Sequence, residues 1–262
     1  MGTRLSKAPV CYTLVQMRFN PRLDVESSLL PLHKAFREEG FPDFSHDTLQ
    51  AVELAQKADG MELRQQQASR FIFRNAKQTA AILLDHNALT YELTDYPVFE
   101  EVSTVFLRAL EITHQHRPIE YFDRLGMRML DAIQPFHGEH LDKYLVPSAL
   151  GLAGLIKGPL KHQQTLIESI FTDEGRTLVV RAVRIPQGIA APPDLSPLRL
   201  KLKKRFIEHQ GESVMLDCDS SKTERTVGFS REKTQDELER LKSDLSTSFR
   251  SLTTDHARTM WA

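Results

Sequence analysis

The chain has 262 residues, of which 40% are hydrophobic and 26% carry a charge, and its formal net charge at pH 7 is −1. This composition is typical of a globular protein that buries a core without covalent cross-links. The near-zero charge excludes a global field that would attract nucleic acid or anionic lipid. No apolar run approaches the roughly 18 residues that are needed to span a bilayer, so we expect no membrane contact.

The N-terminus and the cysteines indicate a cytoplasmic protein. Residues 1–7 are polar and lack the apolar centre of a secretory signal. The two cysteines, Cys11 and Cys218, lie inside apolar runs that resemble strands. This placement is typical of buried thiols in a reducing compartment, although the number of cysteines also allows a disulfide.

The first half of the chain predicts a strand, a helix, four strands and a second helix. Residues 12–19 read as a strand, which Asn20-Pro21 ends because proline removes a backbone donor. Helices are predicted at 27–40, between a serine cap and a glycine stop, and at 96–117. The strands between them are predicted at 48–55, 66–74, 78–84 and 88–93. The short polar links between the last three strands imply an antiparallel meander.

The second half predicts the same order of elements. Residues 120–133 form its clearest strand, because apolar residues alternate there with Glu120, Arg124 and Arg128. A helix is predicted at 137–152, and the closing helix begins with a capping box made by Thr234 and Glu237. The strands between these helices are predicted at 163–171, 176–185, 198–207 and 213–218.

A constant offset relates the two halves. Met17-Arg18 aligns with Met127-Arg128 at 127 − 17 = 110 residues. The repeated order and this offset predict an α+β protein made by tandem duplication of a β-α-β4-α module, with the repeats at 1–117 and 118–262. The alternative is a single α+β domain in which the periodicity has been over-read.

This duplicated order resembles the topology of the TATA-binding-protein fold. That resemblance implies an antiparallel curved sheet with helices packed on one side, the convex one. It concerns topology alone, so no DNA-contacting position is carried over to this chain.

Several short motifs resemble a sporadically distributed, uncharacterised bacterial family. They are Ala8-Pro9-Val10, Gln16-Met17-Arg18-Phe19-Asn20-Pro21, Tyr96-Pro97, Arg124-Leu125-Gly126-Met127-Arg128 and Leu252-Thr253-Thr254-Asp255. The resemblance implies an accessory gene of a phage-defence or toxin–antitoxin locus, and it supplies no catalytic residues.

Two groups of residues invite a search for metal chemistry. His137 and His140 could share a helix face, but the sequence points to no further ligands for a closed site. Asp217 and Asp219 would lie on the same side of a strand, as a two-carboxylate metal site for phosphoryl chemistry requires. Against this, no glycine-serine turn precedes them clearly, and a solvated strand end is the simpler interpretation.

Cationic side chains supply the candidate binding residues. Along 198–206, leucines and Phe206 alternate with Arg199, Lys201, Lys203 and Arg205, which predicts a row of cations on one face of a strand. A solvated face balanced by nearby carboxylates, or protection of a sheet edge, explains the same pattern.

Arg18 and Arg128 occupy equivalent positions in the two predicted repeats. On one face of a duplicated sheet they would lie near its twofold axis and could form a cradle for an anion or a partner. The alternative is that each arginine pairs with a carboxylate on a neighbouring strand.

The sequence contains no phosphate-binding glycine loop, nucleophile elbow or paired CxxC motif. We therefore expect a non-enzymatic protein without a cofactor that binds a macromolecular partner, a toxin or an effector in the setting implied by the resemblance. One alternative is a nucleic-acid-binding protein that uses the basic strand on a saddle-shaped sheet. The other is a metal-dependent nucleotide enzyme centred on Asp217 and Asp219.

Overall fold

A computed structural model describes residues 6–21, 25–57, 60–156, 158–196 and 198–262. For 25–26, 49–57 and 60–68 the description is limited to the backbone. The strands are β1 (Val10–Phe19), β2 (Asp43–Lys57), β3 (Gly60–Arg74), β4 (Ala80–Leu84), β5 (Ala88–Leu93), β6 (Tyr121–Ile133), β7 (Thr165–Asp173), β8 (Arg176–Ile185) and β9 (Ser213–Val227). The α-helices are α1 (Leu29–Glu38), α2 (Phe99–His116), α3 (Lys204–Ile207), α4 (Arg231–Leu252) and α5 (Asp255–Trp261).

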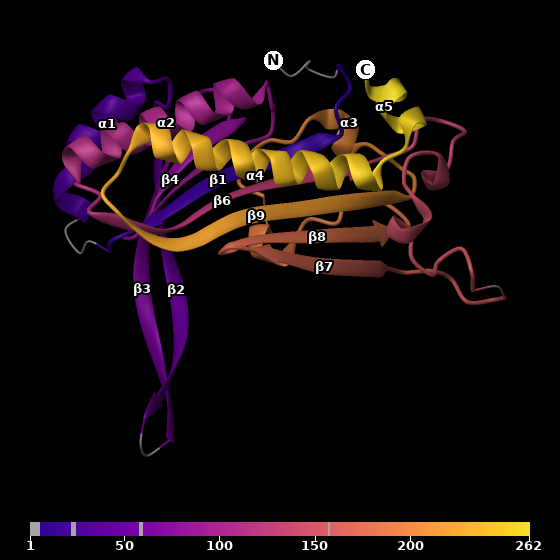
Figure 1. The fold of residues 1–262 in the computed structure, drawn as a ribbon, viewed down its shortest axis with the longest axis horizontal. Coiled ribbons are helices and arrows are strands. Elements are labelled where there is room, and N and C mark those ends of the chain that lie inside the picture. The colour runs from indigo at the N-terminus through magenta and orange to yellow at the C-terminus, as the bar shows by residue number, and fades with distance from the viewer. Residues whose placement is uncertain (1–5, 22–24, 58–59, 157, 197) are drawn as a thin grey trace.

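The strands form one open, antiparallel sheet in the order β2-β3-β4-β5-β1-β6-β9-β8-β7. Helices α1, α2 and α4 lie on the same side of this sheet (Figure 1). The predicted α+β class and the antiparallel sheet are therefore confirmed. The three longest helices lie on one side as predicted, whereas the short helix α3 packs on the opposite face through Phe206. None of the helices in the described part of the chain is long and apolar enough to cross a membrane.

The two central strands have a symmetric register. Gln16 of β1 lies opposite Gly126 of β6, and these two residues are separated by the predicted offset of 126 − 16 = 110. On either side of this pair, Met17 lies opposite Leu125 and Val15 opposite Met127. The predicted boundary at 117/118 falls in the link between α2 and β6, so it divides a chain that forms one continuous sheet.

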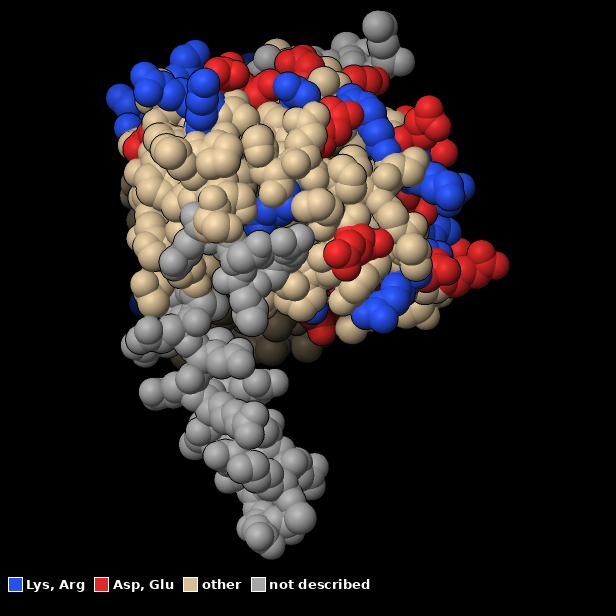
Figure 2. Space-filling view, turned by 90° about the vertical axis from the view of Figure 1, so that its left-hand side faces the viewer, with Lys and Arg blue, Asp and Glu red and all other residues tan. Residues whose placement is uncertain are grey.

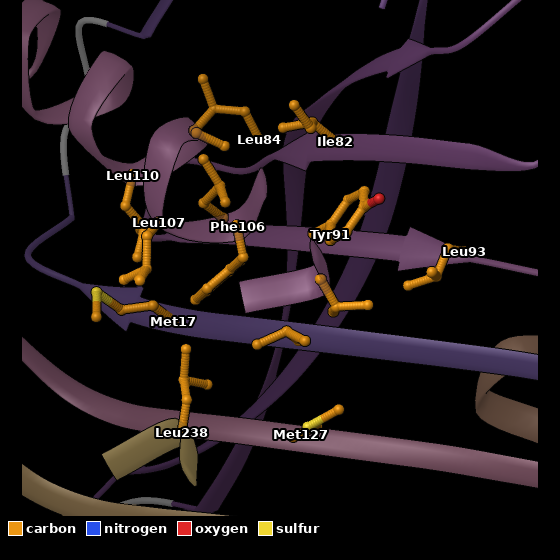
Figure 3. Packing of buried hydrophobic residues seen from close by; sticks show 14 of the residues in the cluster. Met17, Ile82, Leu84, Tyr91, Leu93, Phe106, Leu107, Leu110, Met127 and Leu238 are labelled. Atoms are coloured by element: carbon orange, nitrogen blue, oxygen red, sulfur yellow. The ribbon is translucent and has the colours of Figure 1, made fainter. Parts of the chain in front are cut away.

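The main core fills the space between the helices and the centre of the sheet. Period-2 alternation turns Met17 and Met127 to this side, where both are fully buried. Phe106 of α2 and Leu238 of α4 reach the same cluster from the helices (Figure 3). The two halves of the chain therefore share one hydrophobic core.

The second half departs from the predicted element order in its first helix. Residues 137–152 form two 3-10 turns, η2 (Leu141–Lys143) and η3 (Pro147–Ala149), in place of the expected helix. Gly138 and Gly151 have positive φ angles there, and Pro147 cannot donate within a helix, so the backbone turns repeatedly.

The closing helix also begins earlier than its predicted capping box. Ser230 is the N-cap of α4, and its side chain accepts a hydrogen bond from the Lys233 amide. The Thr234 hydroxyl instead donates to the Ser230 carbonyl oxygen.

Candidate functional site

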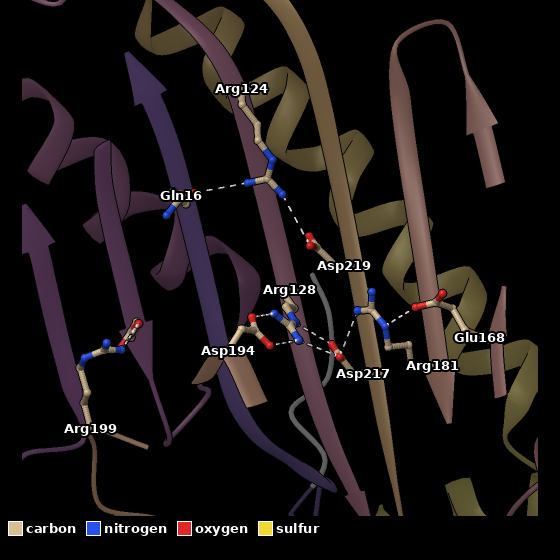
Figure 4. Close-up of polar contacts among 10 residues, drawn as sticks. Gln16, Arg124, Arg128, Glu168, Arg181, Asp194, Arg199, Asp217 and Asp219 are labelled. Carbon is tan, nitrogen blue, oxygen red and sulfur yellow. Dashed lines mark hydrogen bonds and ion pairs between the residues drawn. The ribbon is translucent and has the colours of Figure 1, made fainter. Parts of the chain in front are cut away.

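An ion-pair network occupies the sheet face that points away from α1, α2 and α4, here called the polar face (Figure 4). Arg128 of β6 projects onto this face because its neighbours at odd positions, such as Met127, face the core. Its Nε and Nη2 donate to the two carboxylate oxygens of Asp217 at 2.6 and 2.8 Å. Its Nη1 donates to Asp194 at 2.6 Å, which holds the segment between β8 and α3 against the sheet.

The network continues toward the edge of the sheet. Arg181 of β8 donates to Asp217 at 3.3 Å and to Glu168, the residue opposite it on β7, at 2.5 Å. Four strands and one loop thus contribute alternating charges, and the side chain of Asp217 is only 2% exposed. The predicted placement of Asp217 and Asp219 on one side of a strand is confirmed, but arginines are their partners.

The pKa shifts follow from this pairing. Burial tends to lower the pKa of Arg128, but hydrogen bonds to Asp217 and Asp194 outweigh it and raise that pKa. The hydrogen bond from Arg128 lowers the pKa of Asp194. Burial raises the pKa of Asp219, which the nearby Arg124 partly offsets. The arginines and carboxylates therefore neutralise one another within the network.

The ion pairs of Arg124 and Arg18, near the symmetric centre of the sheet, are more exposed than the pair of Arg128 and Asp217. Arg124 extends over Gly126, where a Cβ atom would lie only 2.8 Å from its Nη1, so a larger residue at 126 would displace the Arg124 guanidinium. Arg124 contacts Gln16 at 3.3 Å and Asp219 at 3.5 Å. Arg18, the predicted equivalent of Arg128, is 50% exposed and lies 3.9 Å from Asp123. The two arginines of the predicted cradle therefore have different surroundings, because Arg128 is buried and Arg18 is exposed.

The predicted basic strand at 198–207 is wrong. Residues 198–203 belong to no strand, and Lys204–Ile207 form the short helix α3. The backbone of Lys201 is held by Gln78 and by the Thr94 hydroxyl, while Leu200 and Phe206 are buried against the polar face. The alternation of leucines and cations therefore belongs to a loop segment that has one apolar side. It does not belong to a strand that pairs with other strands.

The cations of this segment do not form a row. Arg199 lies 3.7 Å from Glu92, and Lys203 lies 2.8 Å from Asp95. Arg205 donates to the backbone carbonyl oxygens of Lys7 and Ala8, and Lys201 is exposed. Viewed from the end that carries α1, most of the surface is uncharged, with a few charged side chains within it and more of both signs along its top and right-hand side (Figure 2).

The last strand of the sheet, β7, is an open edge. In the described part of the chain it pairs with β8 alone, and its sequence contains neither proline nor lysine, the residues that commonly protect such edges. Leu166 is 61%, Ile170 59% and Phe171 58% exposed. In the sequence, the apolar residues of 165–173 fall on both faces of one strand, which was the available signal for this exposed strand. Its position at the edge of the sheet depends on which strands pair in the folded protein.

Further exposed apolar residues lie in the loop that leads into β7. They are Leu152, Leu155, Ile156 and Leu160. Part of this loop and the beginning of β7 enclose a hollow of about 540 Å³, lined by Leu152, Ile156, Leu160, Leu166 and Ile167 among others. The open edge of β7 therefore adjoins this apolar hollow.

The opposite end of the sheet carries a two-stranded ribbon. Strand β3 pairs with β4 from Phe71 to Arg74, whereas from Asp47↔Arg70 to Lys57↔Gly60 strands β2 and β3 pair, among the described strands, only with each other. This ribbon projects from the sheet on the side away from the helices (Figure 1).

Within the described ranges, no three His, Cys, Asp or Glu side chains lie close enough together to hold a metal ion. Comparison of the chain with models of protein families, with curated proteins and with solved structures gave no match. The resemblance to a bacterial family stays a prediction that rests on its short motifs.

Proposed function

We propose that this chain is a non-enzymatic binding protein that takes up an extended segment of a protein partner along β7. The observation that carries the proposal is the nine-residue edge strand with three large apolar side chains exposed. An edge strand presents unpaired N–H and C=O groups that a second chain can satisfy by adding a strand. Side chains on both faces then give the contact its specificity.

The symmetry of the sheet supports this location. Outward from the centre, the first half has β1, β5, β4, β3 and β2, whereas the second half has β6, β9, β8 and β7. We propose that the halves are tandem copies of one module with the topology of the TATA-binding-protein fold. The second copy then lacks the equivalent of β2, and the partner's strand occupies that position beside β7.

The side chains beside the edge define the partner's chemistry. Leu166 and Ile170 lie on the polar face opposite Val183 and Val179 of β8, with Glu168 between them. A complementary segment would alternate apolar residues with small or polar ones. In the phage-defence or toxin–antitoxin setting that the bacterial resemblance implies, the proposed partner is a toxin or an effector.

The charges favour a protein over a nucleic acid as partner. Phosphate binding needs a surface with an excess of cations. Here Arg124, Arg128 and Arg181 pair with carboxylates, and the segment 198–207 contacts Glu92 and Asp95. Of the candidate cations, Arg18, Lys201 and Arg205 are exposed; Arg18 lies on β1, apart from the other two, and Arg205 donates to backbone carbonyl oxygens.

Affinity purification from the native host with matched variants tests the proposal. The double variant Leu166→Lys, Ile170→Lys places two ammonium groups along the edge without changing buried residues. The control Leu30→Lys, Val227→Lys alters two residues that are at least as exposed, on α1 and at the end of β9. We expect the wild type and the control to recover the same protein, and the edge variant to bind it at least roughly tenfold more weakly.

Three outcomes would contradict the proposal. The edge variant could recover the partner as well as the wild type does. The captured material could be lost on nuclease treatment, which would identify a nucleic acid. Native mass spectrometry could show a dimer that the edge variant dissociates, in which case a second copy of the chain occupies β7.

A further inference from the structure

A cavity of about 510 Å³ lies on the helix side of the sheet, away from the polar face. Its walls come from the C-terminal half of α4, the residues that lead into α2 and the first residues of β1. The lining is mainly apolar and includes Val10, Phe99, Met129, Leu245 and Phe249. This size and this lining are typical of sites for small organic molecules.

Asp131 lies in this cavity without a partner. It is only 6% exposed, and on its own side of β6 it lies between Met129 and the fully buried Ile133. Among the described residues, no side chain or backbone group within hydrogen-bond distance donates to its carboxylate. A second lining residue, Tyr96, has a buried hydroxyl that likewise finds no partner in the described part of the chain. Buried polar groups of this kind are normally satisfied by a hydrogen bond.

The charged groups around Asp131 leave its carboxylate available to a ligand. Lys242 of α4 attracts its carboxylate, but no ion pair within 4 Å joins the two in the described chain, and the lysine donates to Ser246 at 2.7 Å. Glu100 of α2, Arg250 of α4 and Arg258 of α5 complete the charged lining, and the Arg258 guanidinium is bonded to Thr253 and Asp255. Cys218 faces the cavity from β9 as a neutral thiol, because burial raises its pKa to about 12.

We propose that this cavity binds a small organic ammonium ion, with the amine against Asp131 and the apolar part against Met129, Leu245 and Phe249. A primary ammonium has three donors and neutralises the buried carboxylate, which neither an alcohol nor a carboxylate ligand does. The Tyr96 hydroxyl can accept a further hydrogen bond from the same nitrogen. Glu100 offsets part of the repulsion from Lys242 and Arg250.

Three probes of nearly equal shape test the ligand class. Calorimetric titration at pH 8 should detect binding of 2-phenylethylamine. The alcohol 2-phenylethanol should bind at least roughly tenfold more weakly, because it cannot neutralise the charge. Phenylacetate should bind more weakly still. No detectable amine binding, or equal or tighter binding of the alcohol or the acid, would overturn the proposal.

The pH dependence and two variants test the location. Burial raises the pKa of Asp131 to about 7, so the carboxylate is ionised at pH 8 and almost wholly protonated at pH 5. Amine affinity should therefore fall roughly a hundredfold between pH 8 and pH 5. Asp131→Asn should abolish this dependence and most of the affinity at pH 8. Asp236→Asn, an exposed carboxylate on the same helix as Lys242, should change neither.

Filling the cavity gives an independent readout. Ser246→Phe places a large ring in the space beside Lys242 without altering Asp131, and it should remove amine binding while thermal unfolding stays cooperative. Undiminished amine binding in Asp131→Asn or in Ser246→Phe would overturn the assignment.

Discussion

Replacing Arg128 by glutamine should lower the free energy of unfolding by about 3–5 kcal/mol, because breaking a buried ion pair leaves an uncompensated charge. Asp217 is almost wholly buried and would keep only the longer contact with Arg181, at 3.3 Å. Asp194, on the segment between β8 and α3, would lose its contact with the sheet. Urea unfolding followed by far-ultraviolet circular dichroism measures the change.

Arg18→Gln is the matched control, since Arg18 is the predicted repeat equivalent of Arg128. Its side chain is half exposed and its nearest carboxylate, Asp123, lies 3.9 Å away. We expect a change below about 0.5 kcal/mol. The double variant Arg128→Met, Asp217→Leu should recover most of the loss, because apolar residues of similar size can replace a buried pair. Equal effects of the two arginine substitutions would show that Arg128 has no special structural role.

Asp131→Asn should stabilise the ligand-free protein at pH 8 by about 2–4 kcal/mol. Burial raises the pKa of this carboxyl from the ordinary 3.8 to about 7, despite attraction from Lys242. Between these values the folded state keeps a proton that the unfolded state has released. The stability of the wild type therefore falls as the pH rises through this interval, and an asparagine at this position does not titrate.

The measurement is the stability difference between Asp131→Asn and wild type at pH 4 and at pH 8. We expect a small difference at pH 4, which is close to the ordinary pKa of 3.8 in the unfolded state and far below the folded-state pKa of about 7, and the full difference at pH 8. Asp236→Asn should show no such trend, since that carboxylate is exposed. A destabilising effect of Asp131→Asn at pH 8 would mean that a group in the protein compensates the ionised carboxylate.

Local sequence patterns predicted the elements whose side chains face one clear core. The alternation in 120–133 matches β6, and the helical spacing after Tyr96-Pro97 matches α2. The same method failed at 198–207, where the alternation fits a segment that lies across a sheet face. Alternation of apolar and polar residues indicates that a segment has an apolar side. Whether other strands pair with that segment is decided by the tertiary structure.

The candidate sites depend even more on tertiary structure. Arg18 and Arg128 follow methionines in matching strands, yet only Arg128 meets carboxylates from residues 194 and 217. The open edge of β7 follows from the absence of another strand beside it, which no local pattern encodes. For the cavity one signal was available, because Asp131 interrupts the apolar face that Met127, Met129 and Ile133 define.

Amide hydrogen exchange of the chain with and without its recovered partner tests the binding account most directly. In the free protein, the β7 amides that point away from β8 lack strand partners and should exchange rapidly. On complex formation these amides should become protected, with little change in the ribbon of β2 and β3 or in α1. Protection confined to the ribbon or to the helices, with β7 unchanged, would contradict the addition of a strand at this edge.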